Sequence, residues 1–490
     1  MIIIISDLHL TDGTFDYTDT LNPGNDINHD VSSEAFELFW NHIYRIVTAN
    51  EADFIKKITL VLLGDILELR STTKWMDDKC NPSGSRPWKE HDNNQIEVCK
   101  KIIDGIDDNN GESLKYICPK KFNQVKDNSN GLRQLIDHDI EIKVVYVVGN
   151  HDRMIVVHDS LKEHVQDRFG WEFSIATDGI GEGHVFMVDD IGLLAYHGHG
   201  GEKPDIIDFY KNYEEPPIGA LLSDVFGRLM YHTQNSEFKK LITFSMELDN
   251  VRPSSDKFAW ILSNLPDKDE DPDELAALRK ILKQCLKELL DESDLIFDFL
   301  YSRLREEMDK IPWWGDILIS LACLFQSKKK CLKKTLMKLL RNMIENLRKD
   351  EEEYPLIKIF EDIQNNIFVK LIPKLLKKKK NRFSGPDSRY YKNAHHEMKN
   401  KVDTPYKYIV YGHSHQYKLI PLITFRGLKD TFYFNSGTWR KTVEKNIFPE
   451  KSGDFQKWNR MTYITFFSES ENSDHIFDIW HGNLQTDKDF

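Results

Sequence analysis

Five short segments of this sequence combine carboxylate, imidazole and amide side chains that suit metal-assisted chemistry. In chain order they are Asp7-Leu8-His9, Gly64-Asp65, Gly149-Asn150-His151-Asp152, His197-Gly198-His199 and Gly412-His413-Ser414-His415. Such oxygen and nitrogen donors suit Mn, Fe, Zn, Ni or Mg rather than copper in a thiolate site. One such segment would be unremarkable, but five together indicate a metal site.

Each segment lies at or just beyond the end of an expected β-strand. Apolar, β-branched runs predict buried strands at Met1–Ser6, Ile58–Leu63 and Ile142–Val148. Further strands are expected at Val185–Val188, Leu193–Tyr196, Tyr408–Tyr411, Lys418–Ile423, Thr431–Phe434, Tyr463–Phe467 and Ile476–Trp480. In open α/β sheets, sites form outside the carboxyl ends of the strands, where separate loops converge. We therefore expect the five segments to meet.

Helical patterns separate the strands and then replace them. A helix is expected to open at Ser32-Ser33-Glu34, so the first third of the chain predicts an α/β core. From about Gly200 strand signals stop, and leucine-rich helical periodicity marks Pro272–Leu290 and Cys331–Leu347. We expect a discontinuous catalytic domain, residues 1–201 and 402–490, split by an all-α insertion or cap at residues 202–401.

The residue types of the five segments, and their order, closely resemble the motif pattern of the calcineurin-like metallophosphoesterase family. That pattern runs D-x-H, G-D, G-N-H-[DE], H, G-H-x-H. The resemblance covers roughly Met1–Gly201 and Thr404–Gly482, and it implies a layered β-sandwich flanked by helices. Asn435-Ser436-Gly437-Thr438-Trp439 also looks like bacterial members. Many members read Gly-Asp-x-x-Asp where this chain has Glu68, an acid that is usually not a ligand.

The resemblance implies two metal ions bridged by Asp65. One ion would also be held by Asp7, His9 and His415, and the other by Asn150, His197 and His413. Mn is the favoured metal, with Fe, Zn, Ni or Mg as alternatives. A bridging hydroxide would attack phosphorus in line. His151 would contact the phosphate and protonate the leaving oxygen, with Asp152 orienting it by a hydrogen bond.

Three further residues are candidates for substrate contact. His199 would lie near the second metal or face the substrate, because the family pattern favours His197 as the ligand. Arg153 follows the Gly-Asn-His-Asp segment and Arg440 follows Trp439, so each is a candidate for holding a phosphate oxygen. A surface salt bridge is the alternative for Arg153, and a plain surface role is the alternative for Arg440.

Charge is unevenly distributed along the 490 residues. The whole chain carries −13, which excludes a uniformly basic nucleic-acid binder. Lys328–Lys401, however, holds 17 lysines and four arginines against nine acidic residues, a net charge of +12. That stretch is either a phosphate-contacting surface or a solvated helix face. The scattered cysteines and the lack of a long apolar run favour a cytoplasmic protein with no membrane span.

These features predict an enzyme that hydrolyses phosphodiester bonds, in a nucleic acid or a nucleotide, with nucleic acid held through Lys328–Lys401. A phosphomonoesterase is an alternative. So is a lipid-linked pyrophosphatase, since Asp-Leu-His-Leu openings resemble lipid A pathway hydrolases. The hypothesis from another class is an inactive metal-bound scaffold that binds protein partners through the helical insertion.

Overall fold

The computed structural model covers the whole chain and describes part of it in detail. The described residues are 1–14, 30–49, 55–87, 93–175, 180–199, 227–233, 239–251, 260, 264, 272–291, 388–400, 406–422, 431–445, 455–471 and 476–483. The chain divides into two compact units. The first consists of Met1–Gly227, Arg389–Glu444 and Phe455–Phe490, and the second of Arg228–Ser388 and Lys445–Asp454.

The first unit is a mixed α/β structure with two mixed sheets. The seven-stranded sheet has the order β10-β11-β1-β2-β3-β4, with β12 paired to β11. Its strands are β1 (Ile2–Ile5), β2 (Lys57–Leu63), β3 (Glu141–Val147), β4 (Glu172–Phe173), β10 (Lys441–Lys445), β11 (Phe455–Phe466) and β12 (Phe477–Asn483). Strands β1 to β4 run parallel, and β11 is antiparallel to both β1 and β12. The three strands that precede the first candidate segments therefore share one direction.

The five-stranded sheet has the order β5-β6-β7-β9-β8. Its strands are β5 (Phe186–Val188), β6 (Leu193–Ala195), β7 (Tyr408–Tyr411), β8 (Lys418–Pro421) and β9 (Phe432–Asn435). The central strands β6, β7 and β9 are parallel, and the edge strands β5 and β8 are antiparallel to their neighbours. Strands β6 and β7 precede the last two candidate segments.

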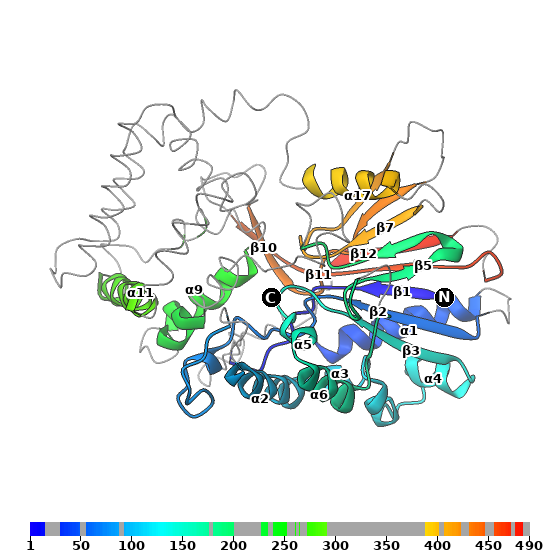
Figure 1. Cartoon of the computed structure of the whole chain (residues 1–490). Coiled ribbons are helices and arrows are strands. Elements are labelled where there is room, and N and C mark those ends of the chain that lie inside the picture. Colours follow the sequence, from blue (N-terminus) through cyan, green and yellow to red (C-terminus); the bar gives the residue numbers. More distant parts are fainter. Residues whose placement is uncertain are drawn as a thin grey trace, which may run out of the picture. The chain divides into compact units, whose positions relative to one another are not determined.

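The two sheets pack against each other through one apolar layer. Because side chains alternate along a strand, Ile4 of β1 points to one face while Ile3 and Ile5 point to the other. Ile4 belongs to a buried cluster that also holds Val61 of β2 and Val410 of β7, so this face of each sheet meets the other sheet. Figure 1 shows the two groups of strands one above the other. This arrangement is compatible with the predicted α/β sandwich.

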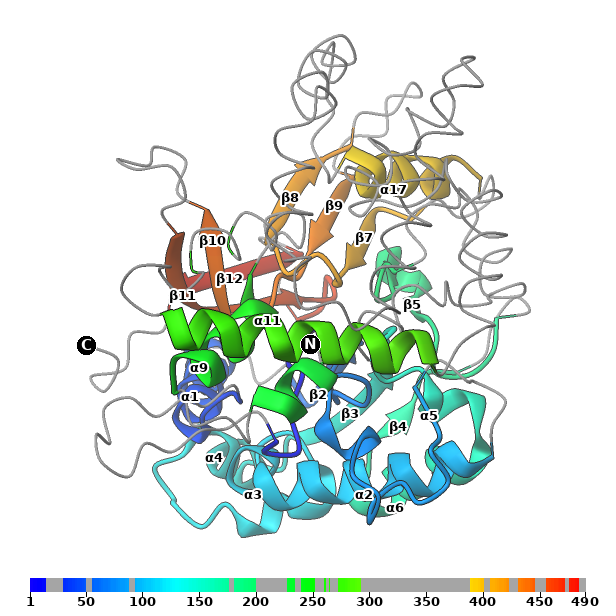
Figure 2. The ribbon, with the colours of Figure 1, turned by 90° about the vertical axis from the view of Figure 1, so that its left-hand side faces the viewer.

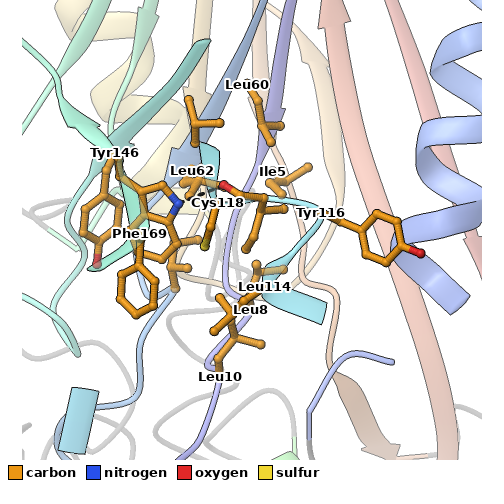
Figure 3. Close-up of a cluster of buried hydrophobic side chains, with 14 of the residues drawn as sticks. Ile5, Leu8, Leu10, Leu60, Leu62, Leu114, Tyr116, Cys118, Tyr146 and Phe169 are labelled. Atoms are coloured by element: carbon orange, nitrogen blue, oxygen red, sulfur yellow. Dashed lines mark hydrogen bonds between the residues drawn. The ribbon is translucent and has the colours of Figure 1, made fainter. Parts of the chain in front are cut away.

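Helices cover the outer face of the seven-stranded sheet. They are α1 (Ser33–Ala49), α2 (Asn94–Asn109), α3 (Gly111–Leu114), α4 (Gly131–Asp137), α5 (Met154–Val157) and α6 (Asp159–Phe169). Short 3₁₀ turns occur at Thr73–Trp75, Pro119–Gln124 and Asp189–Ile191. Ile3 and Ile5 pack with side chains of these helices in the largest apolar cluster. Figure 3 shows part of it, where Ile5, Leu60 and Leu62 gather with Leu114 and Phe169.

Helix α17 (Ser388–Asn400) covers the outer face of the five-stranded sheet. Its residues Ala394, Tyr390 and Tyr391 join a third apolar cluster with Ile409 and Tyr433. Figures 1 and 2 both show α17 on the opposite side of the sheets from α2, α3 and α6. The first unit therefore has four layers, with helices outside both sheets.

The second unit contains α9 (Lys239–Asn250), α11 (Pro272–Asp291) and the helical residues 228–233. Nε2 of His232 lies 3.0 Å from a carboxylate oxygen of Glu288 on α11. The predicted helix Pro272–Leu290 is confirmed. The predicted helix Cys331–Leu347 lies outside the described residues, as does most of the basic stretch Lys328–Lys401, including its lysine runs Lys328–Lys330 and Lys377–Lys380. Helix α17, inside the span predicted as insertion, lies within the unit of the two sheets.

The predicted strands all coincide with observed ones, with ends that shift by a few residues. The largest difference is β11, which extends from Phe455 to Phe466 although only its apolar second half was predicted. Strands β4 and β10 were not predicted. Among the helices that the structure describes, none combines the length and apolarity that a bilayer crossing requires.

Candidate metal centre

The five candidate segments follow five strand ends directly. Strands β1, β2, β3, β6 and β7 end two or three residues before Asp7, Asp65, Asn150, His197 and His413, respectively. Backbone hydrogen bonds join the loops: the amide of Asp7 donates to the carbonyl of Gly64 at 3.0 Å, and that of Gly412 donates to His197 at 3.0 Å. The sheets thus bring together residues that are hundreds of positions apart.

Asp7, His9 and His415 form a first group of potential metal ligands. One ligand atom from each lies within 4.8 Å of the others, and all three residues are buried. Nε2 of His9 lies 3.2 Å from Nε2 of His415, and Nε2 of His415 lies 3.4 Å from a carboxylate oxygen of Asp7. Nitrogen and carboxylate lone pairs converging in a buried space are typical of a divalent metal site.

Asp65, His197 and His413 form a second group that meets the same criterion. Nδ1 of His197 lies 3.1 Å from the carbonyl oxygen of Leu63, to which it donates, and Nε2 lies 3.0 Å from Asp65. A backbone acceptor at Nδ1 fixes the tautomer that offers Nε2 to a metal. His199 is absent from these groups, and its ring centroid lies 5.4 Å from that of His197. The geometry therefore favours His197 as the ligand.

Asp65 lies between the two groups, and Asn150 offers a buried amide oxygen. The Asp65 carboxylate is 3.6 Å from Nε2 of His9 and 3.0 Å from Nε2 of His197. Oδ1 of Asn150 is buried, and it has no hydrogen-bond partner among the described residues. A buried amide oxygen without a donor is costly, and a cation would compensate it. The side chains present therefore fit two ions with Asp65 between them.

The backbone is strained at these same residues. Among the described residues, six non-glycine residues have a positive φ, and five of them are Asp7 (53°), His9 (45°), Asp65 (51°), His413 (67°) and His415 (56°). This left-handed region is unfavourable for residues with a Cβ, at roughly 1–3 kcal/mol each, and such strain clusters at functional sites. Strain confined almost wholly to the candidate ligands indicates that their placement serves a function.

Two glycines permit the close packing of the ligands. A Cβ on Gly149 would lie 2.1 Å from Oδ1 of Asp65, and a Cβ on Gly64 would lie 2.5 Å from the ring of His197. Gly64 also has a φ of +82°. The Gly-Asp and Gly-Asn-His segments thus need glycine for steric reasons that the motif alone does not explain.

Burial and charge set the protonation of the centre. Burial lowers the pKa of His9 to about 4 and that of His413 to about 3, so both rings are neutral at pH 7. Burial opposes ionisation of Asp65, but the charges of His197 and His151 hold its pKa well below its usual range. His197 differs from these two rings: burial opposes its charge, yet Asp65 and Asp7 raise its pKa to about 9. A metal at Nε2 of His197 would therefore displace a proton, whereas His9 and His413 are already in the neutral form that a metal requires.

Glu68, rather than Asp152, orients the predicted general acid. Nδ1 of His151 lies 2.8 Å from Glu68, which also accepts from Nδ1 of His9 at 3.0 Å. Burial disfavours the charged imidazole, yet Glu68 and Asp65 raise the pKa of His151 above its ordinary value. The His151 side chain is 22% exposed, and the backbone amide of His151 donates a hydrogen bond to the Asp65 carboxylate. Its exposure and its hydrogen bond to Glu68 therefore make His151 suited to donating a proton.

Asp152 has a different role from the one predicted. Its carboxylate accepts hydrogen bonds from the hydroxyl of Tyr146 and from the backbone amides of Ile66, at 2.8 Å, and Gly149. No described contact joins it to the ring of His151. Asp152 therefore ties together the loops that carry Asp65 and Asn150, which is a positioning role rather than a direct part in proton transfer.

A further segment, Asn435–Trp439, supports the ligand loops from behind. Asn435 donates from Nδ2 to the carbonyl of Gly412 at 2.6 Å, and Thr438 donates to the carbonyl of Asp7 at 2.7 Å. The hydroxyl of Ser436 lies 2.6 Å from that of Ser6, which bonds to Asp7. The sequence resemblance marked this segment, but its role required the structure.

The three candidates for substrate contact, Arg153, His199 and Arg440, are not part of either ligand group. Arg153 and Arg440 are both buried, so neither has the surface position that its alternative role assumed. The charge of Arg153 contributes, after burial and the neighbouring histidines, to the low pKa of His199. The backbone amide of Arg440 donates to Thr438 at 3.1 Å. These observations leave substrate contact by all three residues as predictions.

Comparison of the chain with protein-family models, with curated proteins and with solved structures finds no match.

Proposed function

We propose that this chain is a two-metal-dependent phosphoesterase that hydrolyses phosphodiester bonds, with Mn²⁺ as its favoured metal. The position of Asp65 carries the proposal. This ionised carboxylate lies within 3.6 Å of His9 and 3.0 Å of His197, each of which belongs to a separate ligand group. A carboxylate shared in this way is what a pair of bridged ions requires.

The chain's own residues support the proton transfer that ester hydrolysis needs. Two divalent ions, when bound, would supply a nucleophilic water and offset charge on the phosphoryl oxygens. Glu68 accepts from Nδ1 of His151 and stabilises the imidazolium, so Nε2 can donate a proton to the leaving oxygen. Asp152 holds the loops on either side, which keeps His151 near Asp65.

The substrate class belongs to the same proposal. We favour a nucleic acid or nucleotide, because the sequence from Lys328 to Lys401 carries a net charge of +12 and directly precedes the segment of His413. Neutralising Lys377–Lys380 should weaken binding of single-stranded DNA and reduce the salt dependence of that binding. An unchanged salt slope would contradict this role.

Hydrolysis of two model esters tests the proposal. We expect the purified protein with Mn²⁺ to hydrolyse bis-p-nitrophenyl phosphate, and to lose this activity with EDTA or on Asp65→Asn substitution. Circular dichroism would verify that the variant folds. Turnover of p-nitrophenyl phosphate alone would indicate a phosphomonoesterase. Two bound ions with no turnover of either ester would favour the scaffold hypothesis.

A further inference from the structure

A buried polar triad joins α17 to the two strands that carry His197 and His413. It consists of Tyr196, Tyr411 and Glu397, with exposed fractions of 3%, 0% and 5%. Tyr196 directly precedes His197, and Tyr411 stands two residues before His413. Glu397 lies on α17, some 200 residues from Tyr196 along the chain. The triad thus connects a distant helix to the backbone of two candidate ligands.

Hydrogen-bond contacts connect each residue of the triad to the other two. The hydroxyl of Tyr411 donates to one carboxylate oxygen of Glu397 at 2.9 Å, and the hydroxyl of Tyr196 donates to the other. The two hydroxyl oxygens lie 2.6 Å apart. An ionised carboxylate only accepts hydrogen bonds, so a buried glutamate needs donors of this kind. Glu397 therefore holds both tyrosines in one fixed arrangement.

The same face of α17 reaches the ring of a candidate ligand. Tyr390, Ala394 and Glu397 follow a spacing of four and seven residues, which places them on one side of the helix. The small side chain of Ala394 is fully buried, and so lets the helix approach the sheet closely. The Tyr390 ring centroid lies 6.3 Å from that of His413 and 6.4 Å from that of Tyr411. Helix α17 is thus linked to the second ligand group in two ways: through Tyr390 beside the ring of His413, and through the bonds of Glu397 to Tyr196 and Tyr411.

We propose that Glu397 is a positioning residue for the metal position formed by Asn150, His197 and His413. By fixing Tyr196 and Tyr411, it holds the ends of β6 and β7 at the separation that two imidazoles need to share one ion. The other position, formed by Asp7, His9 and His415, has no described contact with the triad. The inference rests on the proposed metal centre and assigns α17 a selective effect on one half of it.

Titration of the full chain with Mn²⁺ by calorimetry tests this inference. Partners that orient metal ligands typically contribute 10- to 100-fold to metal affinity. We expect Glu397→Gln to weaken one of two Mn²⁺ sites by about 10- to 100-fold, with the other nearly unchanged. Tyr196→Phe removes only one of the two hydroxyls that bond to Glu397, so it should weaken the same site less. This variant replaces Glu397→Gln in the test if Glu397→Gln does not fold.

A matched control separates positioning from general stability. Tyr463 is also buried, and its hydroxyl bonds to Nδ1 of His42 on the helical side of the seven-stranded sheet. Tyr463→Phe should lower the thermal stability yet leave both Mn²⁺ affinities unchanged. Folded Glu397→Gln with two wild-type affinities, or with both sites weakened equally, would overturn the inference. A wild-type protein that binds two ions without hydrolysing esters would contradict only the proposed reaction.

Discussion

Substitution of Gly149 by alanine should disrupt the metal centre because the new Cβ would overlap both the carboxylate and the backbone nitrogen of Asp65. The new Cβ would lie 2.1 Å from Oδ1 of Asp65, whereas an ordinary contact begins at 3.4 Å. The carboxylate would therefore have to withdraw by about 1.3 Å, far more than the roughly 0.2 Å by which metal–ligand distances vary. A misplacement of about 1 Å can reduce a reaction rate by about 100-fold.

We expect Gly149→Ala to bind Mn²⁺ at least about 10-fold more weakly and to hydrolyse the diester about 100-fold more slowly. Overpacking should also lower the free energy of unfolding by about 1–3 kcal/mol. Calorimetric titration and urea unfolding measure these effects. Gly111→Ala is the matched control, because its Cβ would meet nothing within 4 Å. A folded Gly149→Ala protein with wild-type Mn²⁺ affinity would refute the steric reasoning.

Three further predictions concern other residues. Glu68→Gln should lower the pKa of His151, so the alkaline limb of the diesterase pH–rate profile should move to lower pH, with about a 10- to 100-fold loss in rate; an unmoved limb would argue against His151 as the acid. His197→Ala should remove one of two Mn²⁺ ions while His199→Ala retains both, and equal losses would contradict the ligand assignment. Burial lowers the pKa of His184 to about 4, below its unfolded value of 6.5, so its contribution to stability is present above pH 6.5 and lost as pH falls towards 4. The loss should be on the order of 2 kcal/mol for this partly buried ring, and urea unfolding of His184→Phe should show a correspondingly weaker acid dependence.

Local sequence patterns predicted much of the core correctly. The β-branched runs of β1, β2 and β3 are buried on both sides, so their apolar character is continuous and easy to recognise. The first half of β11 escaped prediction because it carries exposed polar residues, such as Gln456 and Lys457, that give no apolar signal. Strand β4 has only Glu172 and Phe173, which is too short for any periodicity.

The candidate site also has a part that the sequence predicted and a part that it did not. The donors themselves were predictable, since Asp7, Asp65 and His197 each follow an apolar strand within two residues. The partner of His151 was not, because Glu68 and Asp152 are both acids near a Gly-containing turn and the sequence favours the nearer one. Folding places Glu68 beside His151 across 83 residues of chain, while Asp152 turns towards Ile66 and Tyr146.

The sequence by itself determined which groups are available: five expected strand ends, each followed by a carboxylate, amide or imidazole. Their division into three strand ends of one sheet and two of another came from the structure. Only the tertiary structure decided how these groups pair. Hydrogen bonds and steric contacts form between segments that are far apart in the sequence, and they change with differences of a few tenths of an ångström in distance. The Glu397 triad is the clearest case. Two tyrosines and a glutamate carry no motif, and only the packing of α17 on the five-stranded sheet joins them next to the candidate ligands.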